Sequence, residues 1–180
     1  MSVHTRLINR SCPLPPDYRP ICLIDAQIPF DALLSDPKRL LEPQTAYAAR
    51  ALFAHAASCQ IHLYGISGYR SYERQKELYN GSSQIAPPGA SEHQSGLALD
   101  VSCPRIGLAL DESFADTPEG KWLQIHAPLY GFIIRYPKDK QKITGYPWEP
   151  WHIRYVTRSL ALYLTLTGLT LEEFYQMEAG

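Results

Sequence analysis

Two short segments alternate between large apolar side chains and polar or small ones, and this alternation constrains the fold most. In residues 97–102 (LALDVS), the larger apolar side chains fall on one face and Asp100 falls on the other, among small side chains. In residues 151–156 (WHIRYV), His152 and Arg154 share one face, opposite a bulky apolar face that we expect in the core. A period of two is typical of β-strands. The chain is therefore expected to contain a sheet from which polar groups project.

The remaining segments predict helices and loops of unequal length. Residues 43–59 have a proline near the start and apolar residues at helical spacing, including Tyr47 and Leu52. Helices are expected at residues 43–59, at residues 72–80 with Ser71 as the cap, at residues 118–130 after Thr117, and from Thr170 through Tyr175, where Thr170 and Glu173 have capping-box spacing. Strands are expected at residues 61–67, 97–102 and 151–156. Residues 82–90 carry two prolines and a glycine and are expected to form a loop. Without a regular βαβ repeat, this order favours an α+β fold over a doubly wound one.

Size and composition favour one domain and exclude few functions. A chain of 180 residues with 45% hydrophobic residues can fill a single core, so we expect one domain over residues 1–180. Residues 1–42 are expected to form an extended arm packed on it, because prolines crowd residues 13–20. With 17 Lys and Arg against 18 Asp and Glu, the net charge of −1 gives no general attraction to nucleic acid. We expect a monomer.

The cysteines and the apolar segments are the sequence features that indicate the cellular compartment. The four cysteines are scattered without a CxxC pair, which predicts reduced or buried thiols rather than a structural zinc site. The N-terminus has no apolar core of signal-peptide length, and no stretch approaches the roughly 20 apolar residues of a membrane span. The chain as given predicts a cytoplasmic protein without a membrane span. An exported or membrane-anchored protein that lacked its signal would look the same.

Three polar residues can converge on a metal ion. Gly96 lets the backbone bend, so that His93 can return toward Asp100. His152 projects from the second strand, and two imidazoles with one carboxylate leave the fourth position of tetrahedral Zn²⁺ open to water. This arrangement is typical of catalytic zinc, and it predicts one bound ion held by His93, Asp100 and His152.

Two further residues suit hydrolysis. Glu149 precedes Pro150, so we expect it to be extended, near the metal and outside the regular ladder, as the general base for metal-bound water. Arg70 can hold either the oxyanion or a substrate carboxylate, and both roles stay open. The plainer alternatives are that Glu149 caps a backbone amide and that Arg70 pairs with Glu73 or another carboxylate on the surface.

Three segments, taken together and in this order, resemble a known family: residues 67–79 (SGYRSYERQKELY), 91–100 (SEHQSGLALD) and 149–156 (EPWHIRYV). They resemble the zinc D-alanyl-D-alanine carboxypeptidases and dipeptidases of the VanY and VanX type. The pattern SxHxxGxAxD implies metal ligands at His93 and Asp100. The pattern ExxH implies a base at Glu149 and the third ligand at His152.

The same resemblance implies substrate contacts. The pattern YRSxxxQ falls on Arg70 and Gln75, and the first serine of SxHxxGxAxD is Ser91. The alternatives are that Gln75 is a solvated helix residue and that Ser91 belongs to a turn.

The function that the resemblance implies is removal of a terminal D-alanine. The substrate would be a peptidoglycan stem peptide or a precursor ending in D-Ala-D-Ala, and the fold would be a small antiparallel sheet flanked by helices, as in DD-peptidases and hedgehog-type domains. A non-catalytic hedgehog-like zinc module is the first rival, although the presence of Glu149 and Arg70 argues against it. A cell-wall endopeptidase of the same fold is the second. D,D-carboxypeptidase, L,D-carboxypeptidase and dipeptidase activities all stay open.

Some residues near these motifs receive no specific role. Trp148 and Trp151 are expected in the core or in a pocket wall. The lysine-rich residues 137–142 are expected to form a solvated loop, with a lid over the site as the alternative. The histidines without a partner at ligand spacing are His4, His55, His62 and His126.

Overall fold

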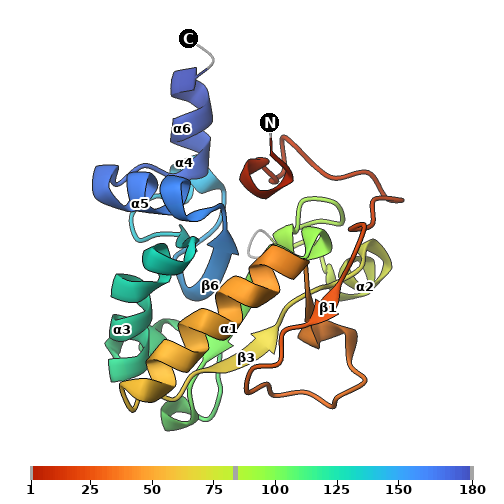
Figure 1. Cartoon of the computed structure of the whole chain (residues 1–180). Coiled ribbons are helices and arrows are strands. Elements are labelled where there is room, and N and C mark those ends of the chain that lie inside the picture. The colour runs from red at the N-terminus through yellow and green to blue at the C-terminus, as the bar shows by residue number, and fades with distance from the viewer. Residues whose placement is uncertain (1, 83–84, 179–180) are drawn as a thin grey trace.

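An antiparallel four-stranded sheet forms the centre of the protein in the computed structural model, which describes residues 2–82 and 85–178 (Figure 1). In spatial order its strands are β3 (Tyr64–Ser67), β4 (Ala98–Ser102), β6 (Glu149–Tyr155) and β5 (Phe132–Tyr136). A short antiparallel ladder, β1 (Ile24–Asp25) with β2 (Leu40–Leu41), lies in the N-terminal region. The prediction of an α+β fold with a small antiparallel sheet is confirmed.

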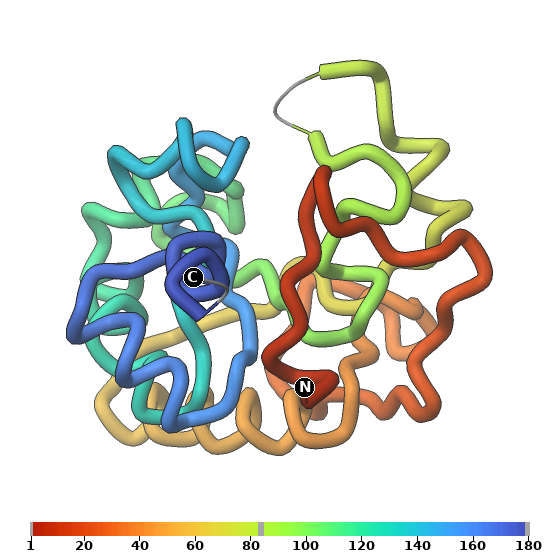
Figure 2. Tube along the Cα trace, turned by 90° about the horizontal axis from the view of Figure 1, so that it is seen from above, coloured from red at the N-terminus to blue at the C-terminus, as the bar shows by residue number. Residues whose placement is uncertain are grey.

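Helices of unequal length surround this sheet. They are α1 (Pro43–Ser58), α2 (Tyr72–Leu78), α3 (Pro118–His126), α4 (Gln141–Thr144), α5 (Arg158–Thr167) and α6 (Leu171–Glu178). Seen from above, the N-terminal and C-terminal parts of the chain gather on opposite sides, and α1 runs along the edge of both (Figure 2). The antiparallel pair of β4 and β6 joins the two sides.

Helix α1 packs one face on the sheet. Its first turn is capped by the Glu42 carboxylate, which accepts a hydrogen bond from the Thr45 N–H at 3.0 Å. The buried side chains recur at helical spacing and join the core that contains Leu99, Val101 and Ile153; on α1 they include Ala46, Ala49, Leu52, Phe53 and Ala56. Tyr47, expected among the apolar positions, is 59% exposed, because its side chain lies on the opposite face of the helix.

The N-terminal arm is held against the segment that precedes β4. The Leu14 N–H donates to the Gly89 carbonyl at 2.9 Å, and the Gln94 amide donates to the Pro15 carbonyl at 3.0 Å. Short 3₁₀ turns and the β1–β2 ladder interrupt the extended course that was expected for residues 1–42. The arm therefore contacts the same loop that carries His93.

Most predicted elements are present, with shifted ends. Strand β3 begins at Tyr64 rather than at residue 61, and α3 continues as a 3₁₀ turn, η6 (Ala127–Tyr130). Strand β5 and helix α5 were not expected from the sequence. The expected loop at residues 82–90 holds no helix or strand where it is described, and residues 83–84 of it lie outside the described residues.

A second core lies under the C-terminal helices. It joins Ile133 of β5 to Leu164 of α5 and Leu171 of α6. The predicted capping box is confirmed, because the Thr170 N–H donates to Glu173 at 2.8 Å and the Glu173 N–H donates to the Thr170 hydroxyl at 3.2 Å.

None of the helices in the described ranges is long and apolar enough to cross a membrane. The cysteines are free thiols: Cys12, Cys22 and Cys59 are exposed and Cys103 is buried.

Candidate metal centre

The turn before β4 brings His93 back over the strand. The 3₁₀ helix η3 (Glu92–Ser95) ends at Gly96, whose φ of 70° lies in the left-handed region that glycine adopts without strain. A Cβ at Gly96 would lie 2.8 Å from a methyl carbon of Leu23 and 2.9 Å from the backbone nitrogen of Glu42. Close packing and backbone conformation together require glycine here, in agreement with its expected role as the bend.

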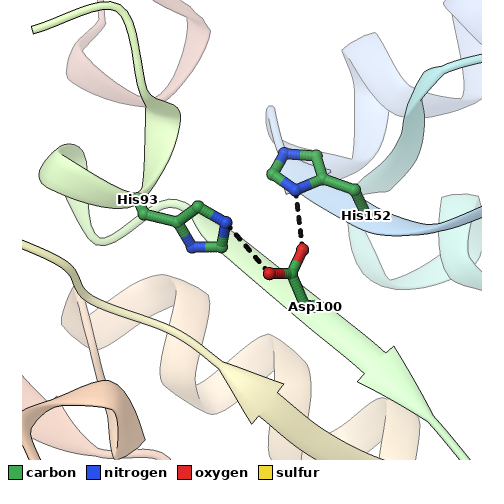
Figure 3. A group of neighbouring side chains, drawn as sticks. All are labelled: His93, Asp100 and His152. Atoms are coloured by element: carbon green, nitrogen blue, oxygen red, sulfur yellow. Dashed lines mark hydrogen bonds and ion pairs between the residues drawn. The ribbon is translucent and has the colours of Figure 1, made fainter. Parts of the chain in front are cut away.

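Asp100 and His152 face each other across β4 and β6. These two residues are paired in the ladder, and His152 Nδ1 lies 2.8 Å from Asp100 Oδ1. His93 Nε2 lies 3.2 Å from the other carboxylate oxygen, Oδ2 (Figure 3). All three residues are buried, with exposed fractions of 3–5%. The structure thus brings the three expected ligands together from two sides of the fold.

The donor set and its spacing suit zinc. One ligand atom from each of the three residues lies within 4.8 Å of the others. Tetrahedral zinc with bonds of about 2.0–2.1 Å holds neighbouring ligand atoms roughly 3.3 Å apart. Each histidine nitrogen lies at a similar distance from its own Asp100 oxygen, 2.8 Å to Oδ1 and 3.2 Å to Oδ2. Within residues 2–82 and 85–178, no other group of three His, Cys, Asp or Glu side chains meets this spacing.

Each histidine has a protein partner for its second ring nitrogen. His93 Nδ1 lies 2.7 Å from the carbonyl oxygen of Gly68, and His152 Nε2 lies 3.4 Å from Glu92 Oε2. A neutral imidazole donates from one nitrogen and offers a lone pair on the other. These contacts therefore leave His93 Nε2 and His152 Nδ1 for an ion.

The local charges keep Asp100 ionised. Burial alone would raise the pKa of Asp100, but His93 and His152 hold it well below its ordinary value. Burial alone would lower the pKa of His152, yet its hydrogen bonds to Asp100 and Glu92 raise that pKa to about 10. Without an ion, protonated His152 is the cation beside Asp100, so metal binding would displace this proton.

Glu149 lies at the start of β6 and lines the same cavity. Its expected place outside the ladder is wrong, because Glu149 pairs with Tyr136 after a register shift between Ile134 and Tyr136. That irregularity accommodates Pro150, which has no N–H to donate. Burial raises the pKa of Glu149 to about 7, with further contributions from the charges of Asp100 and Glu92. The carboxyl can therefore exchange a proton near neutral pH.

Arg70 is held beside the triad by neutral partners. It donates to Gln75 Oε1 at 2.9 Å and to the Ser67 hydroxyl at 3.0 Å, and its guanidinium lies 3.9 Å from Asp100 Oδ2. Glu73, the alternative partner of Arg70, pairs instead with Arg19 at 2.8 Å. The guanidinium is thus directed at the cavity.

Gln75 and Ser91 also line the cavity, but both are buried. Gln75 is 1% exposed, so it is not the solvated helix residue of the alternative. Its side-chain nitrogen donates to the Ala86 carbonyl at 2.7 Å while its oxygen accepts from Arg70. Gln75 therefore orients Arg70. Ser91 precedes η3, and its side chain does not cap that helix.

The cavity next to the triad has a volume of about 150 Å³. Aromatic side chains complete its wall. Trp151 was expected in the core or in a pocket wall, whereas Tyr136 and Tyr146 were not marked by the sequence motifs. The Tyr136 ring stacks on the His152 ring with 5.0 Å between centroids. Tyr136 lies on β5, the strand that was not expected, so its approach to His152 depends on the pairing of β5 with β6.

Two of the remaining histidines and the lysine-rich segment contact other parts of the fold rather than the cavity. His126 stacks on Trp122 with 4.1 Å between ring centroids, and His4 lies 3.3 Å from Glu42. In the lysine-rich segment, Lys140 pairs with Glu173 of α6 at 2.8 Å. That pair ties the segment to the C-terminal helix.

The chain is similar to known carboxypeptidases. Residues 38–158 match the VanY family, described as D-alanyl-D-alanine carboxypeptidase. YodJ of Bacillus subtilis (strain 168) is 40% identical over 94% of this chain and 66% of its own length. A D-alanyl-D-alanine carboxypeptidase of Enterococcus faecium is 44% identical over 60% of this chain and 34% of its own length. The chain thus spans less than two thirds of each of these two relatives.

Solved structures share the fold. The LdcB LD-carboxypeptidase is 40% identical, with a TM-score of 0.91 over 94% of this chain and 84% of that one. A vancomycin-resistance D,D-pentapeptidase VanY variant in complex with Zn(II) is 30% identical, with a TM-score of 0.78 over 97% and 99% of the two chains. VanYB in complex with D-alanine-D-alanine is 30% identical, with a TM-score of 0.79 over 98% and 99%.

Proposed function

The chain belongs to the VanY family of D-alanyl-D-alanine carboxypeptidases, and from this premise we propose that it is a zinc-dependent peptidase. Its substrate is a peptidoglycan stem peptide or precursor, from which it removes the C-terminal D-alanine. The observation that carries the proposal is the convergence of His93, Asp100 and His152 beside Glu149 and Arg70 in one cavity.

One zinc ion bound by the triad would activate a water molecule and polarise the scissile carbonyl. Glu149 is the proton carrier. Burial raises the pKa of its carboxyl above the ordinary value, which favours its taking a proton from the attacking water and returning it to the leaving amine.

Arg70 supplies the positive charge for a substrate anion. Its contacts with Gln75 and Ser67 fix the planar guanidinium before substrate arrives. The group can receive either the terminal carboxylate or the developing oxyanion. Ser91 lies in the same wall and supplies a neutral hydroxyl to the peptide.

An L,D-carboxypeptidase is the second candidate, with a specific observation in its favour. The similarity to LdcB, at 40% identity and a TM-score of 0.91, exceeds the similarity to VanYB, at 30% and 0.79. On this reading the bond cleaved follows an L-configured centre, as in a tetrapeptide.

The test is release of D-alanine from three substrates: a pentapeptide ending in D-Ala-D-Ala, a tetrapeptide with one terminal D-Ala, and the free dipeptide. We expect release from at least one, and loss of release with a chelator. Glu149→Gln should retain zinc and lose about 10²–10⁴-fold in turnover, the usual contribution of general acid–base catalysis. Full turnover in this variant would contradict the role of Glu149.

The pattern of products also separates the rivals. Zinc binding without release from any substrate would favour a hedgehog-like binding module. Cleavage inside cross-linked peptides, without release of a terminal residue, would favour an endopeptidase.

A further inference from the structure

Glu92 is a buried acid that the mechanism above does not use. Its side chain has 0% exposure, and it directly precedes His93 in η3. Its Oε2 lies 3.4 Å from Nε2 of His152, while Nδ1 of the same ring lies 2.8 Å from Asp100. One imidazole thus stands between two carboxylates, and only Asp100 belongs to the metal triad.

The two histidines of the triad differ in their outer partners. His93 has the neutral carbonyl oxygen of Gly68, at 2.7 Å. His152 has the carboxylate of Glu92. A carboxylate that accepts from the outer N–H fixes the tautomer and ring orientation of a ligand histidine and makes its other nitrogen a stronger donor to the metal.

Glu92 is itself held in place on its other oxygen. Its Oε1 accepts from Arg135 Nε at 2.7 Å and from an Arg154 Nη at 2.8 Å. Arg154 also donates to the carbonyl oxygens of His4 and Arg6 in the N-terminal arm, and Arg135 pairs with Glu172 of α6. With Oε1 occupied by two arginines, Oε2 remains for His152.

We propose that Glu92 is a positioning residue for the metal centre: it holds the Nε2 proton of His152, so that Nδ1 faces the ion, and it thereby raises zinc affinity. The inference rests on the metal site of the proposed function. Glu92 also lines the cavity, but in this role it acts through His152, so its effect is on binding of the metal.

The test compares two glutamates of the same buried network. Glu92→Gln removes the carboxylate that faces His152. Glu172→Gln removes a carboxylate from Arg135 but leaves the His152 contact in place. Zinc dissociation constants are measured for both variants and the wild type by competition with a chromogenic chelator, beside thermal unfolding of the metal-free proteins.

We expect Glu92→Gln to weaken zinc binding about 10–100-fold, the usual effect of losing an outer partner of a ligand. Glu172→Gln should keep the wild-type affinity while lowering thermal stability. Unchanged affinity in Glu92→Gln, or an equal loss in Glu172→Gln, would overturn the proposal. Absence of zinc binding in the wild type would refute the proposed function itself, whereas unchanged affinity in Glu92→Gln would refute only the positioning role of Glu92.

A second variant covers the case in which Glu92→Gln does not fold. Glu92→Asp keeps the negative charge for both arginines but shortens the side chain, so it should fold and still weaken zinc binding. In zinc-loaded protein, the Nε2 proton of His152 should resonate downfield by NMR and move upfield in Glu92→Asp. A resonance and an affinity that both stay at their wild-type values would refute the positioning role.

Discussion

Two clusters of buried charge meet at β6, and they differ in what completes them. The closed cluster consists of Glu92, Arg135, Arg154 and Glu172; the metal centre consists of His93, Asp100 and His152, with Arg70 and Glu149 beside it. In the closed cluster two acids meet two arginines at 2.6–2.8 Å. In the metal centre the donor atoms converge on one point next to a cavity.

This difference distinguishes a cluster that is complete within the chain from one that can bind an added ion. Fixed cations inside the chain neutralise the acids of the closed cluster, so it needs no ligand. In the metal centre the nearest arginine is 3.9 Å from Asp100 and is bonded to neutral partners, so the donors suit an added cation. The closed cluster adjoins the metal centre and contacts its histidine, His152, through Glu92.

The largest expected effect breaks the closed cluster. Arg135→Met leaves the buried acids Glu92 and Glu172 short of a cation, and should lower the free energy of unfolding by about 3–5 kcal/mol. Urea unfolding of the metal-free proteins measures the change.

Its matched control is Arg74→Met. Arg74 also pairs with a glutamate, Glu77, at 2.7 Å, but both side chains are more than 60% exposed. Removing this pair should change stability by only about 0.5 kcal/mol or less. Equal losses in the two variants would mean that the closed cluster is no more important than a surface pair.

The next largest effect concerns Glu149 in the metal centre, where we expect a substitution to raise the free energy of unfolding rather than lower it. Burial raises the pKa of Glu149 from its ordinary 4.5 to about 7. Between these pH values the folded protein keeps a proton that the unfolded chain has released, so stability falls as pH rises. Glu149→Gln removes this dependence, and metal-free Glu149→Gln should exceed the wild type by on the order of 3 kcal/mol at pH 8.

At pH 4 the two proteins should have equal stability, because Glu149 is then protonated in both folded and unfolded wild type. Urea unfolding at both pH values gives the difference between the proteins at each. A difference that does not vary with pH would show that Glu149 keeps its ordinary pKa.

Much of the metal centre could be predicted because its signals are local. The alternation in β4 and β6 marks Asp100 and His152, and the glycine at residue 96 marks the bend that returns His93. Capping signals at Ser71, Thr117 and Thr170 likewise identify helix starts within a few residues.

The closed cluster could not be predicted, because its contacts are distant in sequence. Glu92 meets Arg135 and Arg154, which lie 43 and 62 residues away. Read alone, a glutamate beside a motif histidine suggests a surface acid. Strand β5, which carries Arg135, has the run FIIRY without clear alternation, and all but one of its residues are buried. The shared face of His152 and Arg154 was the one local hint.

The metal centre is tested most directly by diffraction from crystals of the zinc-loaded protein on both sides of the zinc absorption edge. We expect one anomalous peak per chain, bonded to His93 Nε2, an Asp100 carboxylate oxygen and His152 Nδ1. No peak at these atoms, or a zinc ion bound by other side chains, would contradict this expectation.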